Sequence, residues 1–445
     1  MHAHRTLVRI GSAFLLASAA AQSQAAGATG TIMLVVANSG SLVAQETARK
    51  TMMEGWGYTV VPISATAWQG TFDTAALTSS CAYICETVSS TDLGTKLKAK
   101  TIPVICDESA LTDDLGISSG YTQYTATSVY ITNTSHYITS GFSSGWLSIF
   151  SSSQPLHYTS GTLGSFTTLA KQSSWSGPTL VVMERGDSLY SSGSAAGRRV
   201  YLPWGGSGMD FTQLSSDGQT MLRRTIEWAL MPACWWKLDD GSGSTAVDST
   251  GGRNGSLNGA SWTTGKVSGA LSFDGSSDYV TISNNSVFQV TGALTIAAWV
   301  YGASWSSDPN YASVILRKGD ANPNNWQLAI NQGYVSLTLD DSDGSSINGS
   351  THLANNKWYH VAGTWDGSKG RVYVNGVLDN TPISHTSSLG TDTRPVYLGG
   401  RTGATDVLNG RLDDVRFYNR CLTAAEIAAL ASSSPTITSW ENVAP

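Results

Sequence analysis

The distribution of apolar residues changes near Pro232, and this change constrains the fold more than any other feature of the chain. Before it, apolar runs of strand length show no polar alternation and are separated by stretches with helical spacing. After it, short strands alternate apolar and polar residues between turn residues. The first pattern predicts a parallel sheet covered by helices on both faces, and the second an antiparallel sandwich or jelly roll. We therefore expect a multidomain chain, with an α/β domain over residues 30–231 and an all-β domain over residues 234–431.

In the first half, the predicted strands are residues 31–37, 58–63, 82–85, 102–106, 179–183 and 199–203, and the predicted helices are 42–55, 92–98 and 216–230. This order of elements, with the phrase Ser135–Gly141, resembles flavodoxin-like, class I glutamine-amidotransferase-like and trehalose-utilisation-like domains. The amidotransferase-like resemblance implies a nucleophilic cysteine on a tight turn flanked by glycines. No Gly-x-Cys-x-Gly occurs in the chain, so we do not transfer that activity.

The first residues predict a secretory signal peptide. Arg5 and Arg9 precede an apolar stretch at 10–21, which is followed by the small-residue site Ser23–Ala25. The apolar stretch is shorter than the roughly 20 residues that cross a bilayer, and no later segment is long enough. We expect residues 1–25 to be removed and the protein to be secreted, extracellular or periplasmic, without a transmembrane segment.

Composition supports an exported globular protein and excludes some partners. With 15 Trp and 17 Tyr, the chain is unlike a disordered protein. The formal charge is −6 and basic residues are not clustered, which argues against nucleic acid as a partner. A cell-surface adhesin is a third interpretation, weakened because the Ser-rich tail at 432–445 has no anchor motif.

In the second half, strands are predicted at 293–300, 326–330, 335–339, 358–365, 371–374 and 377–378, with a tight hairpin turn at Asn375–Gly376. Six phrases follow one another: Trp235–Asp240, Ala270–Gly275, the strand containing Trp299, Trp358–Ala362, Val372–Gly376 and Gly410–Asn419. Through them this half resembles laminin-G-like, concanavalin A-like jelly-roll domains. The resemblance implies a binding or adhesion module, often with a structural calcium. A short capping helix is predicted to follow, with Thr423 as its N-cap.

One carboxylate of the last predicted strand gives a local reason to expect that ion. Asp413 shares a strand face with Val415, so it is predicted to lie on the side that carries apolar core residues. A buried carboxylate needs a cation, an arginine or backbone N–H donors. Because first and last strands commonly meet in jelly rolls, the glycine-rich loop at 248–255 could close on this strand. Calcium would then take oxygens from Asp248, Asn254 and Asp413. The alternative is turn residues, with the carboxylate paired to arginine or backbone.

The cysteines allow several pairings. Cys234 precedes the first strand of the second half and Cys421 follows the last, which predicts a disulfide, with two buried free thiols as the alternative. Cys85 and Cys106 end successive strands and could form a bridge if those strands are neighbours. Cys81 would then remain a lone buried thiol.

A catalytic interpretation places an active site at the ends of the parallel strands, where ligands of open α/β sheets bind. Cys85 or Cys106 would be the nucleophile, and the bases or orienting groups would be Glu86, Asp107, Glu108, His136 or His157. The alternative treats them as buried thiols and ordinary loop histidines. The segment Asn38–Ser41 could likewise bind an anion or simply cap a helix.

Aromatic residues of the second half suggest sugar stacking. The candidates for ligand contact lie near polar loops and are Trp305, Tyr311 and Trp326, whereas Trp236, Trp299, Trp358 and Trp365 are expected in the core. The glucanase signature Glu-x-Asp-x-Glu is absent, so the sandwich is not expected to hydrolyse glycans itself.

Taken together, these patterns predict a secreted protein whose sandwich binds an extracellular glycan or protein surface, beside a non-catalytic α/β domain. The alternative is a secreted polysaccharide-active or ester hydrolase that uses the sandwich as a substrate anchor.

Overall fold

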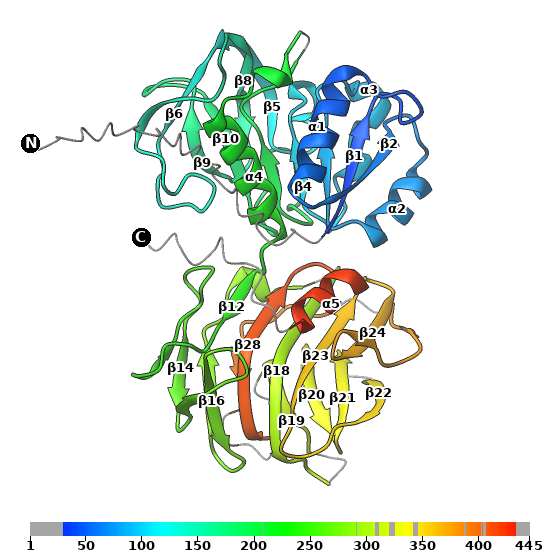
Figure 1. Cartoon of the computed structure of the whole chain (residues 1–445), viewed down its shortest axis with the longest axis vertical. Helices are drawn as coiled ribbons and strands as arrows, with labels where there is room; N and C mark the ends of the chain where they lie inside the picture. The colour runs from blue at the N-terminus through cyan, green and yellow to red at the C-terminus, as the bar shows by residue number, and fades with distance from the viewer. Residues whose placement is uncertain are drawn as a thin grey trace, which may run out of the picture.

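The computed structural model describes residues 30–432, except for residues 207, 291, 308–310, 320–324, 341–345, 387–388, 402 and 404–405. The predicted signal at 1–25, and the tail beyond residue 432, lie outside the described residues. The chain forms two domains that follow each other in sequence. Figure 1 shows the α/β domain above and the sandwich below it.

One mixed sheet forms the centre of the α/β domain. Its parallel part has the order β2 (Thr59–Ser64), β1 (Thr31–Val36), β3 (Cys81–Ile84), β4 (Val104–Cys106) and β11 (Arg199–Tyr201). The order continues with antiparallel β10 (Pro178–Met183), β9 (Thr167–Lys171), β6 (Ser128–Ile131) and β7 (Gly145–Ser148). A separate antiparallel ribbon is formed by β5 (Ser118–Ala126) and β8 (Gln154–Leu163). The predicted α/β class is confirmed, but the sheet is not parallel throughout.

The antiparallel part arises where the sequence lacks a crossover helix. A parallel connection within a sheet usually passes through a helix. Residues 184–198, which join β10 to β11, have no helical spacing and form turns instead. The chain therefore turns back along its own strand, and β10 and β11 are antiparallel.

Helices cover both faces of the parallel strands, as their continuous apolar character implies. Ile32 of β1 packs with Met53 of α1 in one cluster, and Met33 packs with Phe72 of α2 in the other. The first face carries α1 (Ala44–Gly55), α4 (Ser216–Leu230) and the 3-10 turn η3 (Phe211–Gln213). The second face carries α2 (Gln69–Thr78), α3 (Ser90–Leu93) and the 3-10 turns η1 (Gly94–Leu97) and η2 (Ser109–Leu111). Helix α4 spans the predicted residues, and the Ser215 hydroxyl caps it by accepting the Gly218 N–H at 3.1 Å.

Two antiparallel sheets form the C-terminal sandwich, which confirms the predicted jelly-roll class. The β18 sheet has the order β15 (Ser261–Thr264), β16 (Gly269–Asp274), β28 (Asn409–Tyr418), β18 (Leu294–Ser304), β23 (Trp358–Trp365), β24 (Lys369–Val374) and β25 (Val377–Leu378), with β12 (Cys234–Trp236) on β28 and β26 (Ile383–Ser384) on β24. The β20 sheet has the order β13 (Thr245–Ala246), β14 (Gly255–Asn258), β17 (Tyr279–Ile282), β27 (Val396–Leu398), β19 (Ser313–Lys318), β20 (Trp326–Asn331), β21 (Tyr334–Leu339) and β22 (Ser346–His352). The 3-10 turn η4 (Ser286–Phe288) enters the space between them.

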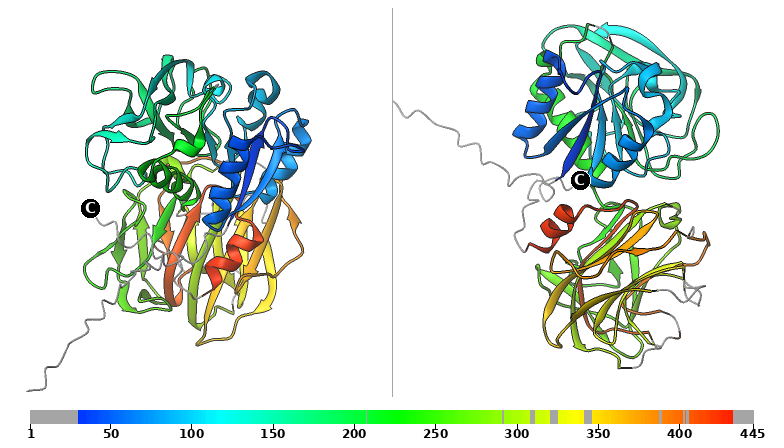
Figure 2. Two further views of the ribbon diagram at one scale, coloured as in Figure 1. Left: turned by 45° about the horizontal axis from the view of Figure 1, so that its top comes forward. Right: turned by 90° about the vertical axis from the view of Figure 1, so that its right-hand side faces the viewer.

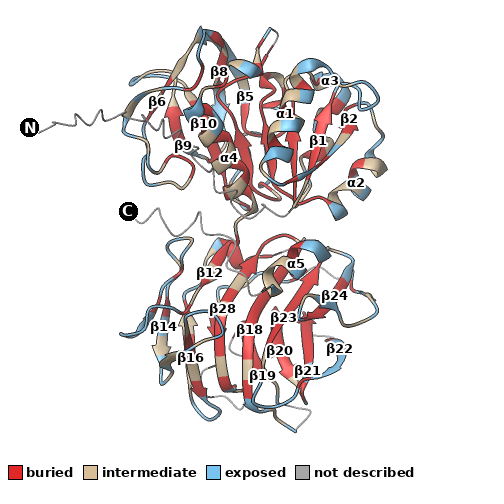
Figure 3. Ribbon diagram, viewed as in Figure 1, coloured by how far each residue is buried: buried red, intermediate tan, exposed pale blue. Residues whose placement is uncertain are grey.

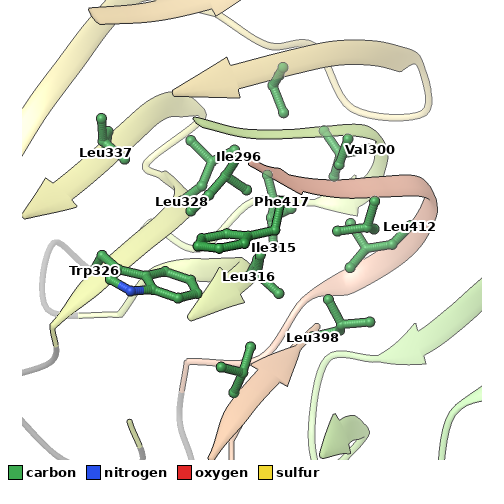
Figure 4. Packing of buried hydrophobic residues seen from close by; sticks show 14 of the residues in the cluster. Ile296, Val300, Ile315, Leu316, Trp326, Leu328, Leu337, Leu398, Leu412 and Phe417 are labelled. Carbon is green, nitrogen blue, oxygen red and sulfur yellow. The ribbon is translucent and has the colours of Figure 1, made fainter. Parts of the chain in front are cut away.

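The apolar core of the sandwich lies between the two sheets, where Figure 3 shows the strands to be buried. Trp326 stacks on Phe417 with ring centroids 4.9 Å apart, and Figure 4 shows both rings beside Leu328 and Ile296. Side chains from both sheets thus meet in one continuous cluster, because each strand alternates inward apolar and outward residues.

The C-terminal helix α5 (Ala424–Ala431) packs on the outer side of the β18 sheet, at the end nearest the α/β domain (Figures 1 and 2). Its start is a capping box: Thr423 Oγ1 accepts the Glu426 N–H at 3.3 Å, and Glu426 accepts the Thr423 N–H at 2.9 Å. This confirms the predicted N-cap.

The two domains are joined by hydrogen bonds from buried arginines. Arg185 of the α/β domain donates to the carbonyl oxygens of Ala293 and Asn419, at 3.0 and 2.8 Å. In the other direction, Arg420 donates to the Leu230 carbonyl at 3.3 Å. Both guanidinium groups are buried, so each satisfies backbone oxygens that water does not reach.

Candidate functional site

At the carboxyl ends of the parallel strands, a buried ion network surrounds Arg49. Its Nε lies 3.0 Å from Asp107 Oδ2, and its Nη2 lies 2.5 Å from Glu86 Oε2. The Tyr83 hydroxyl donates to the same Asp107 oxygen at 2.8 Å, and the guanidinium covers the Phe211 ring at 4.2 Å. Burial, the largest cause, raises the pKa of Asp107 to about 6 and that of Glu86 to about 7, although Arg49 opposes it. Arg49 thus pairs with both carboxylates, but burial still favours their protonated forms, and the buried Asp107 Oδ1 has no hydrogen-bond partner among the described residues.

A second buried carboxylate occupies the position where the strand order changes direction, between β1 and β3. Glu46 accepts the N–H groups of Ala37 and Val43, at 3.1 and 3.0 Å, and the Thr87 hydroxyl at 2.5 Å. Open α/β sheets bind ligands at this place, and a helix start favours anions. Here the anion is the protein's own side chain. The helix begins at Ala44, with Val43 as its N-cap, instead of at the predicted residue 42, so the Asn38–Ser41 segment does not cap it.

The structure gathers the predicted bases Glu86 and Asp107 around Arg49 but separates the two predicted nucleophiles. Cys85 packs on the cluster beside α1 and Cys106 on the opposite face of the sheet, so no bridge or shared site forms. Burial raises the pKa of both thiols well above the usual value. Burial likewise lowers the pKa of His136 to about 4 and that of His157 to about 3, and His157 Nε2 lies 2.8 Å from the Leu202 carbonyl oxygen.

The remaining predicted bases have local partners. Glu86 and Asp107 belong to the Arg49 network, and Glu108 accepts the Ala110 N–H at 2.7 Å. The chain contains one Gly-x-Ser-x-Gly phrase, at 141–145, which leads into β7 instead of forming a strand-to-helix turn.

On the outer side of the β18 sheet, aromatic and polar residues share neighbouring cross-strand positions. Along β18, Ile296 and Val300 point into the sandwich, while Trp299 and Tyr301 lie on the outer side. The register places Tyr301 between Arg411 and Trp358, on the two strands beside it.

These rings lie close to each other and to cations. The centroids of Tyr301 and Trp358 are 5.6 Å apart, and the Arg411 guanidinium lies 5.2 Å from the Tyr301 ring. Lys266 Nζ lies 5.2 Å from the Trp299 ring. Farther along, the guanidinium of Arg416 covers Trp235 at 4.4 Å. We call Trp235, Trp299, Tyr301 and Trp358 the aromatic face.

Hydrogen-bonding groups border the aromatic face. The Tyr301 hydroxyl bonds to Asn356 Oδ1 at 3.1 Å. Trp235 Nε1 donates to Asp414, whose Oδ2 lies 2.9 Å from Arg416 Nη2. Trp235, Tyr301 and Trp358 are half-buried, and Trp299 is 6% exposed. The aromatic face thus combines partly exposed rings with donors and acceptors, a combination that can stack on and hydrogen-bond to a sugar.

The sequence interpretation placed Trp299 and Trp358 in the core. Trp299 is buried as predicted, although on the outer side of the sheet, whereas Trp358 is half-buried and its prediction was wrong. Trp236 and Trp365 are core residues as expected, at 0% and 1% exposure. The alternation of Ile296, Ala298 and Val300 with the residues between them was the signal that could have separated the two groups.

Asp413 also lies on this outer side, because the strand contains a bulge. Asp414 has a φ of 53°, and the register with β18 shifts here. The predicted sharing of a face with Val415 is therefore wrong: Val415 enters the core and Asp413 does not. The turn between β15 and β16 covers Asp413, whose Oδ2 accepts the N–H groups of Lys266 and Val267, both at 2.7 Å. Burial raises the pKa of Asp413 to about 7.

The three predicted calcium ligands do not share a site. The first and last strands meet as expected, but Asp248 pairs with Trp236 on the side of β12 away from β28. Its Oδ1 accepts the N–H groups of Trp235 and Thr250, both at 3.0 Å, and Asn254 Oδ1 accepts the Asp248 N–H at 2.9 Å.

Those oxygens already face hydrogen-bond donors, and Arg253 lies 3.6 Å from the remaining Asp248 oxygen, so the donor set does not fit calcium. Within the described ranges, no group of three or more His, Cys, Asp and Glu side chains is arranged to hold a metal ion. Calcium binding by the domain stays a prediction, without an assigned site.

The three predicted ligand-binding aromatics have different surroundings. Trp326 is fully buried in the sandwich core, so its prediction was wrong. Trp305 folds over Gly302, and its Nε1 donates to the Leu353 carbonyl at 2.8 Å. Tyr311 is 38% exposed. Of the three, Tyr311 is the most exposed.

The predicted Cys234–Cys421 disulfide is not formed. Each of the five cysteines, all of which lie in the described ranges, is a free thiol. Cys234 points into the sandwich core, whereas Cys421 lies on the outer side of the same sheet, beside Thr364. Two side chains on opposite faces of a sheet cannot approach to bonding distance.

The antiparallel two-sheet fold and its partly exposed outer face define the C-terminal domain as a concanavalin A-like sandwich. Residues 274–428 match the family described as "Concanavalin A-like lectin/glucanases superfamily". No curated protein sequence matches the chain significantly.

Solved structures resemble the chain over less than half of its length. Domain 4 of an extracellular arabinanase from Geobacillus stearothermophilus, in complex with arabinotriose, is 17% identical with a TM-score of 0.38, covering 45% of this chain and 98% of that one. Trypanosoma rangeli sialidase is 19% identical with a TM-score of 0.35, and the match covers 44% of this chain and 32% of that one. The binding domain of botulinum neurotoxin serotype G is 14% identical with a TM-score of 0.36, and the match covers 45% of this chain and 50% of that one. The match thus spans only a third to a half of the sialidase and neurotoxin chains.

Among the described residues, no helix has the length and apolar character needed to cross a membrane.

Proposed function

We propose that this protein is a secreted glycan-binding protein, and that the aromatic face of its sandwich contacts the sugar. The observation that carries the proposal is the cross-strand set Arg411, Tyr301 and Trp358, in which two neighbouring rings lie beside a guanidinium on the outer side of a rigid sheet. Sugar rings present C–H groups that stack on aromatic rings, and hydroxyls that bond to Arg411 and Asn356. The family match over residues 274–428, to lectins and glucanases, supports this choice.

In this proposal the α/β domain is a non-catalytic companion. The buried Arg49 network and Glu46 fill the strand ends with the protein's own charges. A hydrolase there would need a reactive thiolate or an available base. The raised pKa values of Cys85 and Cys106 oppose the first requirement, and the pairing of Glu86 and Asp107 with Arg49 opposes the second.

A glycan array with the mature protein tests the proposal, followed by titration of the strongest hits. The double variant Tyr301→Ala/Trp358→Ala should bind at least about tenfold more weakly, since stacked rings contribute roughly 1 kcal/mol each. The control is Tyr279→Ala, which removes a half-buried ring from the β20 sheet and should leave binding unchanged. Wild-type affinity in the double variant, with its fold intact by circular dichroism, would exclude the aromatic face.

A further inference from the structure

The free edge of the α/β sheet carries unusually exposed tryptophans. Strand β7 ends the strand order, and its Trp146 is 63% exposed. In the loop that joins β9 to β10, Trp175 is 93% exposed. Tryptophan is buried on average in folded proteins, so two open rings in one region need an explanation.

The strand register places Trp146, Tyr130 and Lys171 on one side of the sheet. Tyr130 of β6 lies opposite Trp146 on one neighbouring strand and opposite Lys171 on the other. The rings of Tyr130 and Trp146 are 5.5 Å apart at 88°, so their planes meet edge to face. The adjacent residue Val129 points into the core on the other side. Trp175 follows Lys171 in a loop closed by the Gln172 N–H to Gly177 carbonyl bond at 2.8 Å. We call Trp146, Tyr130, Lys171 and Trp175 the edge face.

The groups around these rings are hydroxyls and amides. Ser128 and Ser148 hydroxyls lie 3.1 Å apart beside the Tyr130 and Trp146 pair. Beside Trp175, the Ser176 hydroxyl donates to Gln172 Oε1 at 3.1 Å. In sequence, Lys171 is the only charged residue of β6, β7, β9 and the 172–177 loop.

This composition selects among partner classes. An acidic polymer or a charged protein surface would need several complementary charges, and the edge face has one. An amphipathic helix would need a continuous aliphatic groove, whereas here isolated rings stand among hydroxyls. An uncharged chain of sugars matches both properties, because its C–H faces stack on rings and its hydroxyls bond to serine and glutamine side chains.

We infer that the edge face is a second carbohydrate-binding surface, which takes a neutral polysaccharide. The inference shares its ligand class with the proposed function, but it rests on different residues in the other domain. With two surfaces on one chain, attachment at one raises the local concentration of sugar at the other, so an extended or insoluble polymer is held more tightly than a short oligosaccharide.

Depletion isotherms on insoluble cellulose, chitin, mannan and arabinan test this inference, with soluble polygalacturonate and heparin as acidic comparisons. The full mature chain is compared with Trp146→Ala/Trp175→Ala and with Trp68→Ala, a control that removes another tryptophan, 75% exposed, beside α2. We expect the double variant to bind a neutral polymer at least tenfold more weakly, and the control to bind like wild type, with equal melting temperatures.

The remaining outcomes separate the edge face from the aromatic face. If Trp146→Ala/Trp175→Ala loses polymer binding while Tyr301→Ala/Trp358→Ala keeps it, the edge face is supported and the proposed function is contradicted. If only Tyr301→Ala/Trp358→Ala loses polymer binding, the edge face alone is overturned. Wild-type binding by the edge variant, no neutral polymer bound at all, or loss confined to the acidic polymers also overturns it. Sedimentation equilibrium tests whether a second copy of the chain binds the edge face instead. A wild-type dimer that becomes monomeric in Trp146→Ala/Trp175→Ala would overturn the inference.

Discussion

The protonation of Asp413 links the stability of the sandwich to pH. Its folded pKa is raised to about 7, chiefly by burial, whereas an unfolded aspartate titrates near 4. A raised carboxyl pKa means that the folded state holds the proton more tightly. The associated stability is present at low pH and is lost as pH rises through about 7.

Replacing Asp413 by Asn should remove this dependence. Between pH 5 and pH 8, the free energy of unfolding of the wild type should fall by up to about 2 kcal/mol relative to Asp413→Asn. Urea unfolding of both proteins at each pH measures the difference. Parallel pH profiles for the two proteins would contradict the buried, protonated carboxyl.

Trp326 separates core packing from ligand contact. Because the ring is fully buried against Phe417, Trp326→Ala should destabilise the protein by about 3–5 kcal/mol. Thermal unfolding measures the loss. At temperatures where the variant is folded, its glycan affinity should stay at the wild-type value, and a selective loss of binding would instead place Trp326 at a site.

Single residues were the hardest level to predict from sequence. Residue type alone suggested that Trp358 was core, whereas the alternation of Tyr359 and Val361 with their neighbours on β23 marks its side chain as lying on the outer side of the sheet. The Asp414 bulge reverses the alternation that placed Asp413 with Val415. A bulge leaves no clear mark in the sequence, since it is fixed by the pairing of β28 with its neighbours.

Elements with local signals were predicted well. Helix α4 and the start of α5 follow from spacing and capping residues that interact within one turn. The antiparallel ribbon of β5 and β8 was not predicted, because its polar, Ser- and Thr-rich strands show little apolar alternation. Its stability comes from pairs such as Ala126 with Gln154 and Ser118 with Leu163, which are distant in the sequence, and a local pattern does not contain that information.

The capping box of α5 gives a prediction at this scale. Thr423→Ala removes the hydroxyl that accepts the Glu426 N–H and should lower the free energy of unfolding by about 1 kcal/mol. Thr423→Ser keeps the hydroxyl and serves as the control. Chemical denaturation of the three proteins measures the effect, and equal losses in both variants would argue against capping.

At the scale of the molecule, Arg185 connects the domains. Arg185→Ala would leave the Ala293 and Asn419 carbonyl oxygens without their donor in a buried interface, at a cost of about 1–3 kcal/mol for each unsatisfied group. We expect a lower unfolding midpoint and faster proteolysis near residues 231–233. The control, Arg223→Ala, removes a helix-surface pair with Glu227 and should cost about 0.5 kcal/mol or less. Equal effects of the two substitutions would mean that Arg185 does not stabilise the interface.

The position of β28 has a consequence for how the protein is made. This strand, the last of the sandwich, lies between β16 and β18 and also pairs with β12. During synthesis, β16, β18 and β12 therefore cannot form their pairs with β28 until residue 418 has been made. Until then, the edges of these strands that pair with β28 stay unpaired. The last strand of the α/β domain is synthesised about two hundred residues before β28. The α/β domain can therefore fold first, with Arg185 already in place to contact the sandwich when its last strand pairs.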